Sequence, residues 1–88
     1  MPTISFFYGI AIRMYFRDHA PPHFHAVYGE HEAFVAIETG EIVFGYLPKT
    51  AARLVSEWAL ARRAQLRNNW TRAQQSLPLE RLPGLQDD

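Results

Sequence analysis

The sequence predicts an α+β domain: an antiparallel meander of four or five strands, with one long C-terminal helix packed on one face of the sheet. Three observations support it. Apolar and polar residues alternate in the first half of the chain, apolar residues recur with a helical period over residues 48–74, and the alternating runs are separated by short connections. The 88 residues, 48% of them hydrophobic, predict a single domain over residues 1–77 and an extended or flexible tail over residues 78–88.

Five runs of residues that favour strands follow one another along the first half of the chain. They lie at residues 3–6, 10–17, 23–28, 31–38 and 41–46. Glycine or proline falls between most of them, and these residues favour turns. Gly29-Glu30 is a hairpin signal, because glycine suits the first central position of a two-residue turn. Short connections pair consecutive strands antiparallel, which gives the meander.

The alternation divides the strand residues between the two faces of the sheet. The apolar set, predicted to lie under the helix, comprises Ile10, Ile12, Met14, Phe16, Phe24, Ala26, Tyr28, Ala33, Val35 and Ile37. One helix covers only one face, so the other face is predicted to lie in solvent. That second face carries Arg13, Tyr15, Arg17, His23, His25, Glu32 and Phe34.

The predicted helix begins near Pro48, since proline suits the first turn of a helix, and continues to about Gln74. Its apolar face comprises Ala51, Leu54, Val55, Trp58, Leu66 and Ala73. Its opposite face carries Lys49, Arg53, Arg63 and Arg67, which form either a solvated surface or a contact for nucleic acid or an acidic protein. Arg62 falls within the apolar stripe, where it either keeps its head group in water or pairs with Glu38.

Composition and charge exclude several classes of protein. The absence of cysteine excludes a disulfide scaffold, a thiolate zinc site and a cysteine nucleophile. No apolar run reaches the length of a membrane span, and the start MPTISFFYG lacks the basic residues of a signal peptide, so a cytoplasmic protein without membrane contact is expected. The net charge is zero, but residues 30–41 carry −4 and residues 49–72 carry +5.

The histidines are the candidate catalytic residues. His23 and His25 are two residues apart on a predicted strand, so their rings lie on the same side and either could transfer a proton. Arg13 and Arg17 are placed to hold a phosphate, which suggests a small hydrolase or ribonuclease. His19 belongs to the same histidine-rich segment and is a further binding candidate, and Tyr15 with Phe34 could stack on single-stranded nucleic acid.

Two other roles for His23 and His25 remain open. A metal site needs three or four convergent ligands, and Glu30 or Glu32 could add a carboxylate. Alternatively, the histidines form structural hydrogen bonds around the Pro21-Pro22 turn. No metal ion and no cofactor are predicted from the sequence. The uncovered sheet face and the 14% aromatic content predict a homo-oligomer with an interface at Phe7, Phe34 and Trp70.

Several segments carry a resemblance to a known family. They are MPTIS, FYGI, IRMYF, DH, PPHFH, YGE, IET and LP, together with Trp58 and Asn69-Trp70, and PPHFH is the most specific. Over about residues 1–77 the chain resembles the bacterial family known as domain of unknown function four-one-six-zero. The resemblance implies a small cytoplasmic protein that is often encoded beside a second small protein, as in a toxin–antitoxin pair. It implies no catalytic residues.

The function expected from this resemblance is that of a component of a toxin–antitoxin-like module. It would act through a small protein partner, with RNA or DNA as a further candidate partner. A small hydrolase that uses His23 and His25 with Arg13 and Arg17 is one alternative, and a structural dimeric interaction module is another. Whether the chain is an enzyme stays open at this point.

Overall fold

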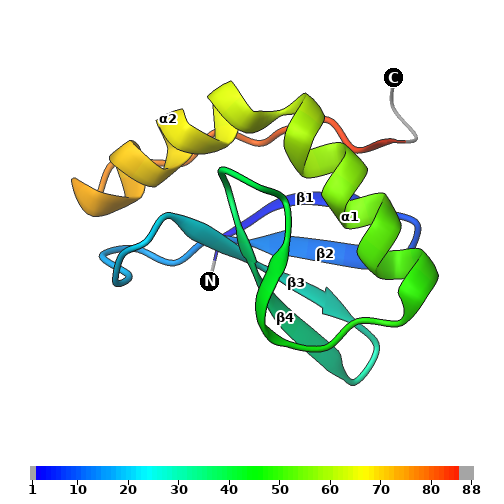
Figure 1. Ribbon diagram of the computed structural model, residues 1–88. Coiled ribbons are helices and arrows are strands. Elements are labelled where there is room, and N and C mark those ends of the chain that lie inside the picture. The colour runs from blue at the N-terminus through cyan, green and yellow to red at the C-terminus, as the bar shows by residue number, and fades with distance from the viewer. Residues whose placement is uncertain (1, 86–88) are drawn as a thin grey trace.

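A computed structural model describes residues 2–85 as a five-stranded sheet and two helices (Figure 1). The strands are β1 (Thr3–Phe7), β2 (Ile10–Arg13), β3 (His23–Tyr28), β4 (His31–Ala36) and β5 (Ile42–Gly45), and the helices are α1 (Lys49–Ala61) and α2 (Arg63–Gln74). The strand order in the sheet is the order in the chain, and all neighbouring strands are antiparallel. The predicted α+β class and antiparallel meander are therefore confirmed, with five strands.

The prediction of one long helix is wrong, because the helix is divided at Arg62. The backbone of Arg62 (φ −115°, ψ 23°) is not helical, and α2 starts at the next residue. A straight helix over residues 49–74 would be about 39 Å long at 1.5 Å per residue. The longest dimension of the molecule is 33 Å, so the division keeps both helices against the sheet.

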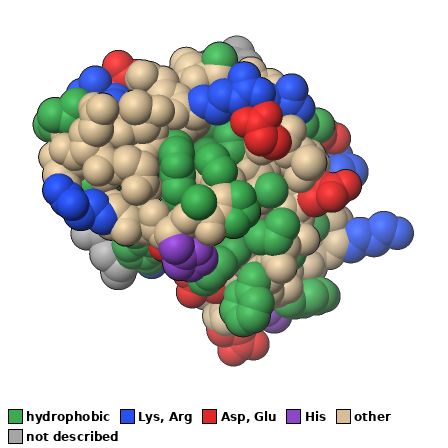
Figure 2. All heavy atoms as spheres, turned by 60° about the vertical axis from the view of Figure 1, so that its left-hand side comes forward, with side chains coloured by type: hydrophobic (Ala, Val, Ile, Leu, Met, Phe, Trp, Pro, Cys, Tyr) green, Lys and Arg blue, Asp and Glu red, His purple; other side chains and the backbone are tan. Residues whose placement is uncertain are grey.

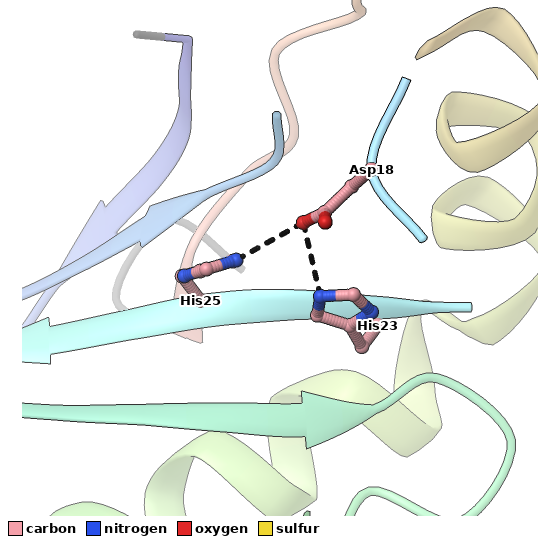
Figure 3. Close-up of side chains that lie close together, drawn as sticks. All are labelled: Asp18, His23 and His25. Carbon is pink, nitrogen blue, oxygen red and sulfur yellow. Dashed lines mark hydrogen bonds and ion pairs between the residues drawn. The ribbon is translucent and has the colours of Figure 1, made fainter. Parts of the chain in front are cut away.

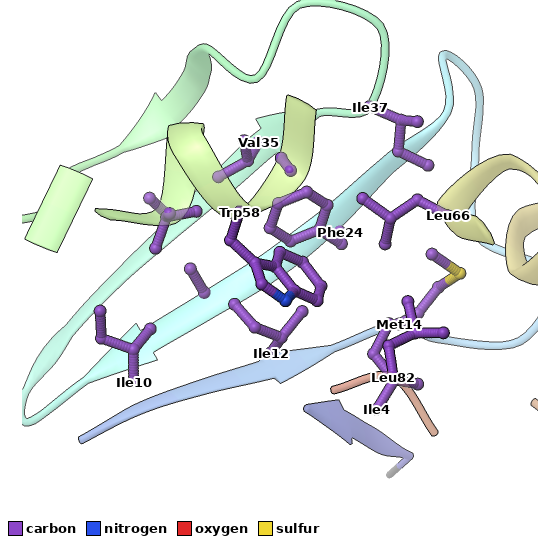
Figure 4. Packing of buried hydrophobic residues seen from close by; sticks show 14 of the residues in the cluster. Ile4, Ile10, Ile12, Met14, Phe24, Val35, Ile37, Trp58, Leu66 and Leu82 are labelled. Atoms are coloured by element: carbon purple, nitrogen blue, oxygen red, sulfur yellow. The ribbon is translucent and has the colours of Figure 1, made fainter. Parts of the chain in front are cut away.

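The core lies between the helices and one face of the sheet (Figure 4). Trp58 of α1 is its largest fully buried side chain, and the inward-facing residues of β2, β3 and β4 surround it as the alternation predicts. Phe7 is also fully buried, with its ring centroid 5.3 Å from that of Trp58, so its assignment to an interface is wrong. Phe16 and Tyr28, predicted to face the helix, are both exposed.

Strand β2 is shorter than predicted, because the chain leaves the sheet after Arg13. The backbone N–H of Arg17 donates to the carbonyl of Ala73 in α2 (3.1 Å), and Arg17 has a left-handed backbone (φ 56°). Tyr15 and Arg17 thus belong to the β2–β3 loop instead of the strand. This loop is anchored to α2, which determines where its side chains lie.

The segment after α2 packs as an extended arm against β1 and the helices. Leu82 is buried, and its N–H donates to the carbonyl of Ile4 (2.7 Å). The carbonyl of Pro83 accepts hydrogen bonds from Trp58 Nε1 (2.8 Å) and Arg62 Nε (3.1 Å). Residues 86–88 of the predicted tail lie outside the described residues. Neither helix among residues 2–85 is long and apolar enough to cross a membrane.

Candidate functional site

Asp18, His23 and His25 form a cluster at one end of the sheet (Figure 3). Both histidines are on β3, and the two-residue repeat of a strand directs their rings to the same side. Asp18 comes from the β2–β3 loop. Its Oδ2 atom lies 3.0 Å from His23 Nε2 and 3.3 Å from His25 Nε2.

The second nitrogen of each ring also has a partner. His23 Nδ1 lies 2.8 Å from the carbonyl oxygen of Pro21, and His25 Nδ1 lies 3.0 Å from Glu32 Oε2. Glu32 is on β4, directly beside β3. Each imidazole therefore has a contact at both nitrogens, with groups from the β2–β3 loop and from β4.

The cluster is buried, which corrects the prediction that both histidines lie in solvent. His23 is 4% exposed and His25 is 7% exposed. Aromatic rings surround them. The ring centroids of Tyr15 and Phe34 lie 4.4 and 4.2 Å from the centroid of the His25 ring, and the centroid of Trp70 in α2 lies 5.4 Å from that of the His23 ring. The β2–β3 loop and α2 cover this end of the second sheet face, although no helix packs along the whole of it.

The loop that carries Asp18 is fixed by hydrogen bonds to the end of α2. Gln74 Nε2 donates to the carbonyl of Asp18 (3.0 Å), and Arg17 Nε donates to Ser76 Oγ (2.9 Å). Burial alone would raise the pKa of Asp18, but the hydrogen bond from the backbone N–H of His19 and the contacts with His25 and His23 lower the pKa below its usual value. Asp18 is accordingly an ionised carboxylate beside two imidazoles.

The other predicted site residues divide between the cluster and its surroundings. Arg13 is opposite His25 in the β2–β3 register, so both side chains lie on one face, and Arg13 Nε is buried without a hydrogen-bond partner. His19 is largely exposed, with Nε2 3.7 Å from Asp18 Oδ1. The backbone N–H of Arg17 donates to Ala73 in α2, and its Nε donates to Ser76 Oγ. The prediction that Arg13 and Arg17 lie on the same face of the sheet is therefore wrong.

The basic side of the helices is partly paired with acids. Arg53 bonds Glu57 one turn later (3.0 Å), and Arg67 makes a two-pronged contact with Glu38, with Nε 2.6 Å from Oε2. The predicted pair of Arg62 with Glu38 is therefore replaced by Arg67 with Glu38. Arg63 Nε is buried without a hydrogen-bond partner.

The pair of Glu38 and Arg67 predicts a pH dependence of stability. Its hydrogen bonds lower the pKa of Glu38 and raise that of Arg67. When the pKa of a glutamate is lower in the folded chain than in the unfolded chain, its ionised form stabilises the fold at pH values above the unfolded pKa of about 4.3. This stabilisation is lost as the pH falls through the folded pKa. We expect wild type to melt slightly above Glu38→Gln at pH 7, and the two melting temperatures to converge on acidification. Thermal unfolding at a series of pH values measures this; a difference that is unchanged at low pH would contradict it.

Sequence reasoning missed Asp18 as a member of the site. It considered Glu30 and Glu32 as possible acidic neighbours of the histidines, and Glu32 does contact His25. One feature of the sequence could have indicated it: Asp18 precedes His23 by only five residues, and the Pro21-Pro22 turn between them returns the chain toward the start of β3. This spacing alone does not show which way the Asp18 side chain points, because that depends on the hydrogen bonds between the loop and α2.

The edge strand β5 is a second unusual feature of the surface. All four of its residues are exposed, and several exposed fractions are large for apolar side chains: Val43 59%, Phe44 68% and, just after the strand, Tyr46 62%. No charged residue occurs between Glu41 and Lys49. Figure 2 shows hydrophobic side chains gathered on one face of the molecule, with acidic and basic side chains around them.

Comparison with known proteins gives one family. A family described as Domain of unknown function (DUF4160) matches residues 9–71. No curated protein and no solved structure matches the chain.

Proposed function

Because the chain belongs to the DUF4160 family, whose description names no activity, we propose its function from its own surface: it binds a small protein partner through the edge strand β5, as one component of a toxin–antitoxin-like pair. The observation that carries this proposal is the exposed, uncharged edge of the sheet. Val43 and Phe44 belong to the strand itself, and Tyr46 follows it.

An edge strand presents backbone N–H and C=O groups that have no neighbour on one side. Proteins that do not use such an edge usually protect it with a lysine, a proline or a cover of other residues. Residues 42–47 contain neither lysine nor proline, and they are apolar apart from glycine. An added strand would satisfy the backbone groups and bury the aromatic side chains at the same time.

The charge around β5 specifies the chemistry of the partner. Residues 30–41 carry four glutamates and no lysine or arginine, and all four are exposed. Glu32 and Glu38 already contact His25 and Arg67, which leaves Glu30 and Glu41 to face a partner. An extended apolar segment flanked by lysine or arginine would complement this border. A second copy of the chain would instead bring another acidic segment into the same sheet. Nucleic acid is disfavoured at this surface for the same electrostatic reason.

The burial of the histidines supports a binding function over the hydrolase alternative. His23 and His25 are both more than nine-tenths buried, and each ring already has a protein contact at both nitrogens. Substrate would have to displace the β2–β3 loop to reach them. The edge strand, in contrast, is accessible without any change in the fold.

Replacing Phe44 with lysine is expected to weaken partner binding by about 30-fold or more, because a central aromatic contact is typically worth about 2 kcal/mol. The probe is the small protein that a toxin–antitoxin-like arrangement would encode next to this chain, produced together with it and titrated by calorimetry. Phe6→Lys is the matched control, since Phe6 is an exposed aromatic (55%) on β1, the opposite edge.

Three results would contradict the proposal. One is the absence of a complex with the neighbouring protein, and another is equal weakening by Phe44→Lys and Phe6→Lys. The third is a wild-type homodimer that Phe44→Lys dissociates in light scattering, which would assign β5 to self-association.

A further inference from the structure

We propose that Asp18, His23 and His25 bind one divalent transition-metal ion, with Asp18 Oδ2, His23 Nε2 and His25 Nε2 as its protein ligands. The sequence-based prediction assigned no metal ion, because spacing alone places only two ligands together. The fold adds a carboxylate from a loop and brings all three ligand atoms within 4.8 Å of one another. This site does not depend on the role of β5.

The spacing of the ligand atoms suits a small cation. Nitrogen and oxygen ligands about 2.0–2.1 Å from one ion lie roughly 3.0–3.4 Å from each other. The distances from Asp18 Oδ2 to the two Nε2 atoms, 3.0 and 3.3 Å, fall in this range. An ion can therefore enter the cluster with small movements of the side chains (Figure 3).

The outer nitrogens have the partners that metal-bound histidines commonly have. A carbonyl oxygen accepts only, so His23 Nδ1 donates a hydrogen bond to the Pro21 carbonyl, and the neutral His23 imidazole then carries a lone pair on Nε2 directed toward Asp18. His25 has a carboxylate at each nitrogen, Glu32 Oε2 at Nδ1 and Asp18 Oδ2 at Nε2, and the tautomer that donates from Nδ1 to Glu32 leaves the Nε2 lone pair for a metal. Histidine ligands of metals are commonly oriented in this way, by a carbonyl or carboxylate behind the ring.

The same arrangement is electrostatically unfavourable without a cation at its centre. The lone pair of His23 Nε2 and a carboxylate oxygen of Asp18 face each other in a buried, aromatic-lined environment. His23 Nε2 has no hydrogen-bond partner despite its burial, since its 3.0 Å contact with Asp18 lacks hydrogen-bond geometry. Buried polar atoms are rarely left unpaired, and a divalent cation would satisfy His23 Nε2 and the Asp18 carboxylate at once.

The ligand set selects the class of ion. Two imidazoles and one carboxylate, without thiolate, suit zinc and the neighbouring divalent metals of the first transition row. The charges of Asp18 and Glu32 together balance a charge of +2. Three protein ligands leave at least one coordination position for water or for another ligand.

Zinc alone is the probe for this site, added to untagged protein and followed by calorimetry and thermal unfolding. We expect one ion per chain, and a melting temperature raised by roughly 10–20 °C when free zinc is about 100 times its dissociation constant. Cobalt bound at the same site should show visible absorption bands from nitrogen and oxygen ligands. Both measurements are independent of any activity.

Three variants locate the ion. Asp18→Asn should weaken zinc binding by about 100-fold or more, and Glu32→Gln, which removes the negative charge behind His25, by about 10- to 100-fold. His31→Gln is the control, because His31 lies outside the cluster at the start of β4, and should leave the affinity unchanged. Asp18 and Glu32 are more accessible than the histidines, and circular dichroism of the metal-free variants establishes that they fold. Failure of wild type to bind zinc, cobalt or nickel would overturn the proposal, as would zinc affinity that is unchanged in Asp18→Asn.

Discussion

Replacing Trp58 with alanine is expected to destabilise the chain by about 3–5 kcal/mol, the largest effect of any single substitution considered for the core. The Trp58 side chain is 1% exposed, and its ring contacts those of Phe7 and Phe24 with centroid distances of 5.3 and 5.7 Å. It joins α1, the first strand and the central strand of the sheet. Alanine would leave a cavity that these elements cannot fill without moving. Urea unfolding followed by circular dichroism measures the loss.

Trp58→Phe separates packing from hydrogen bonding at this position. It keeps much of the buried ring but removes the Nε1–H that donates to the Pro83 carbonyl. That carbonyl retains a hydrogen bond from Arg62 Nε, so it is not left unpaired, and the cost should be about 1–2 kcal/mol. A loss as large for phenylalanine as for alanine would show that the hydrogen bond to the C-terminal arm, and not the packing of the ring, stabilises this part of the fold.

The fold was largely predictable because its determinants are local in the sequence. The alternation in β2, β3 and β4 identifies inward residues such as Ile12, Phe24 and Val35 without knowledge of their neighbours. The division at Arg62 was not predictable in the same way, since it depends on the size of the sheet that the helices cover. Phe7 was misassigned for a related reason: its contact with Trp58 joins residues 51 positions apart in the sequence.

The candidate site was predictable only in part. The spacing of His23 and His25 correctly placed both rings on one side of a strand. Their burial and the approach of Asp18 arise from the docking of the β2–β3 loop on α2, through contacts such as Gln74 with the Asp18 carbonyl. Contacts between segments this far apart leave no periodic signal. The exposure of β5 was also not predictable from the sequence pattern, since it follows from the position of that strand at the edge of the sheet.

Replacing Gly45 with alanine is expected to cost about 2–4 kcal/mol, because both its backbone and its surroundings exclude a side chain. Its φ of +87° is unfavourable for other residues, and an added Cβ would collide with the carbonyl oxygen of Glu32 and lie 3.0 Å from Ala33 Cα. These are backbone atoms of β4, so they cannot rotate away, and β5 would have to separate from β4.

Gly29→Ala is the matched control for this substitution. The φ of Gly29 is also positive (+59°), but nothing lies within 4 Å of the added Cβ, so only backbone strain of about 1 kcal/mol is expected. Urea unfolding compares the two losses, and hydrogen exchange of the Tyr46 amide, which donates to the Glu32 carbonyl (3.1 Å), reports whether the edge has opened. Equal losses in the two variants, with an unchanged Tyr46 amide, would mean that the close contact between β5 and β4 does not constrain this edge of the sheet.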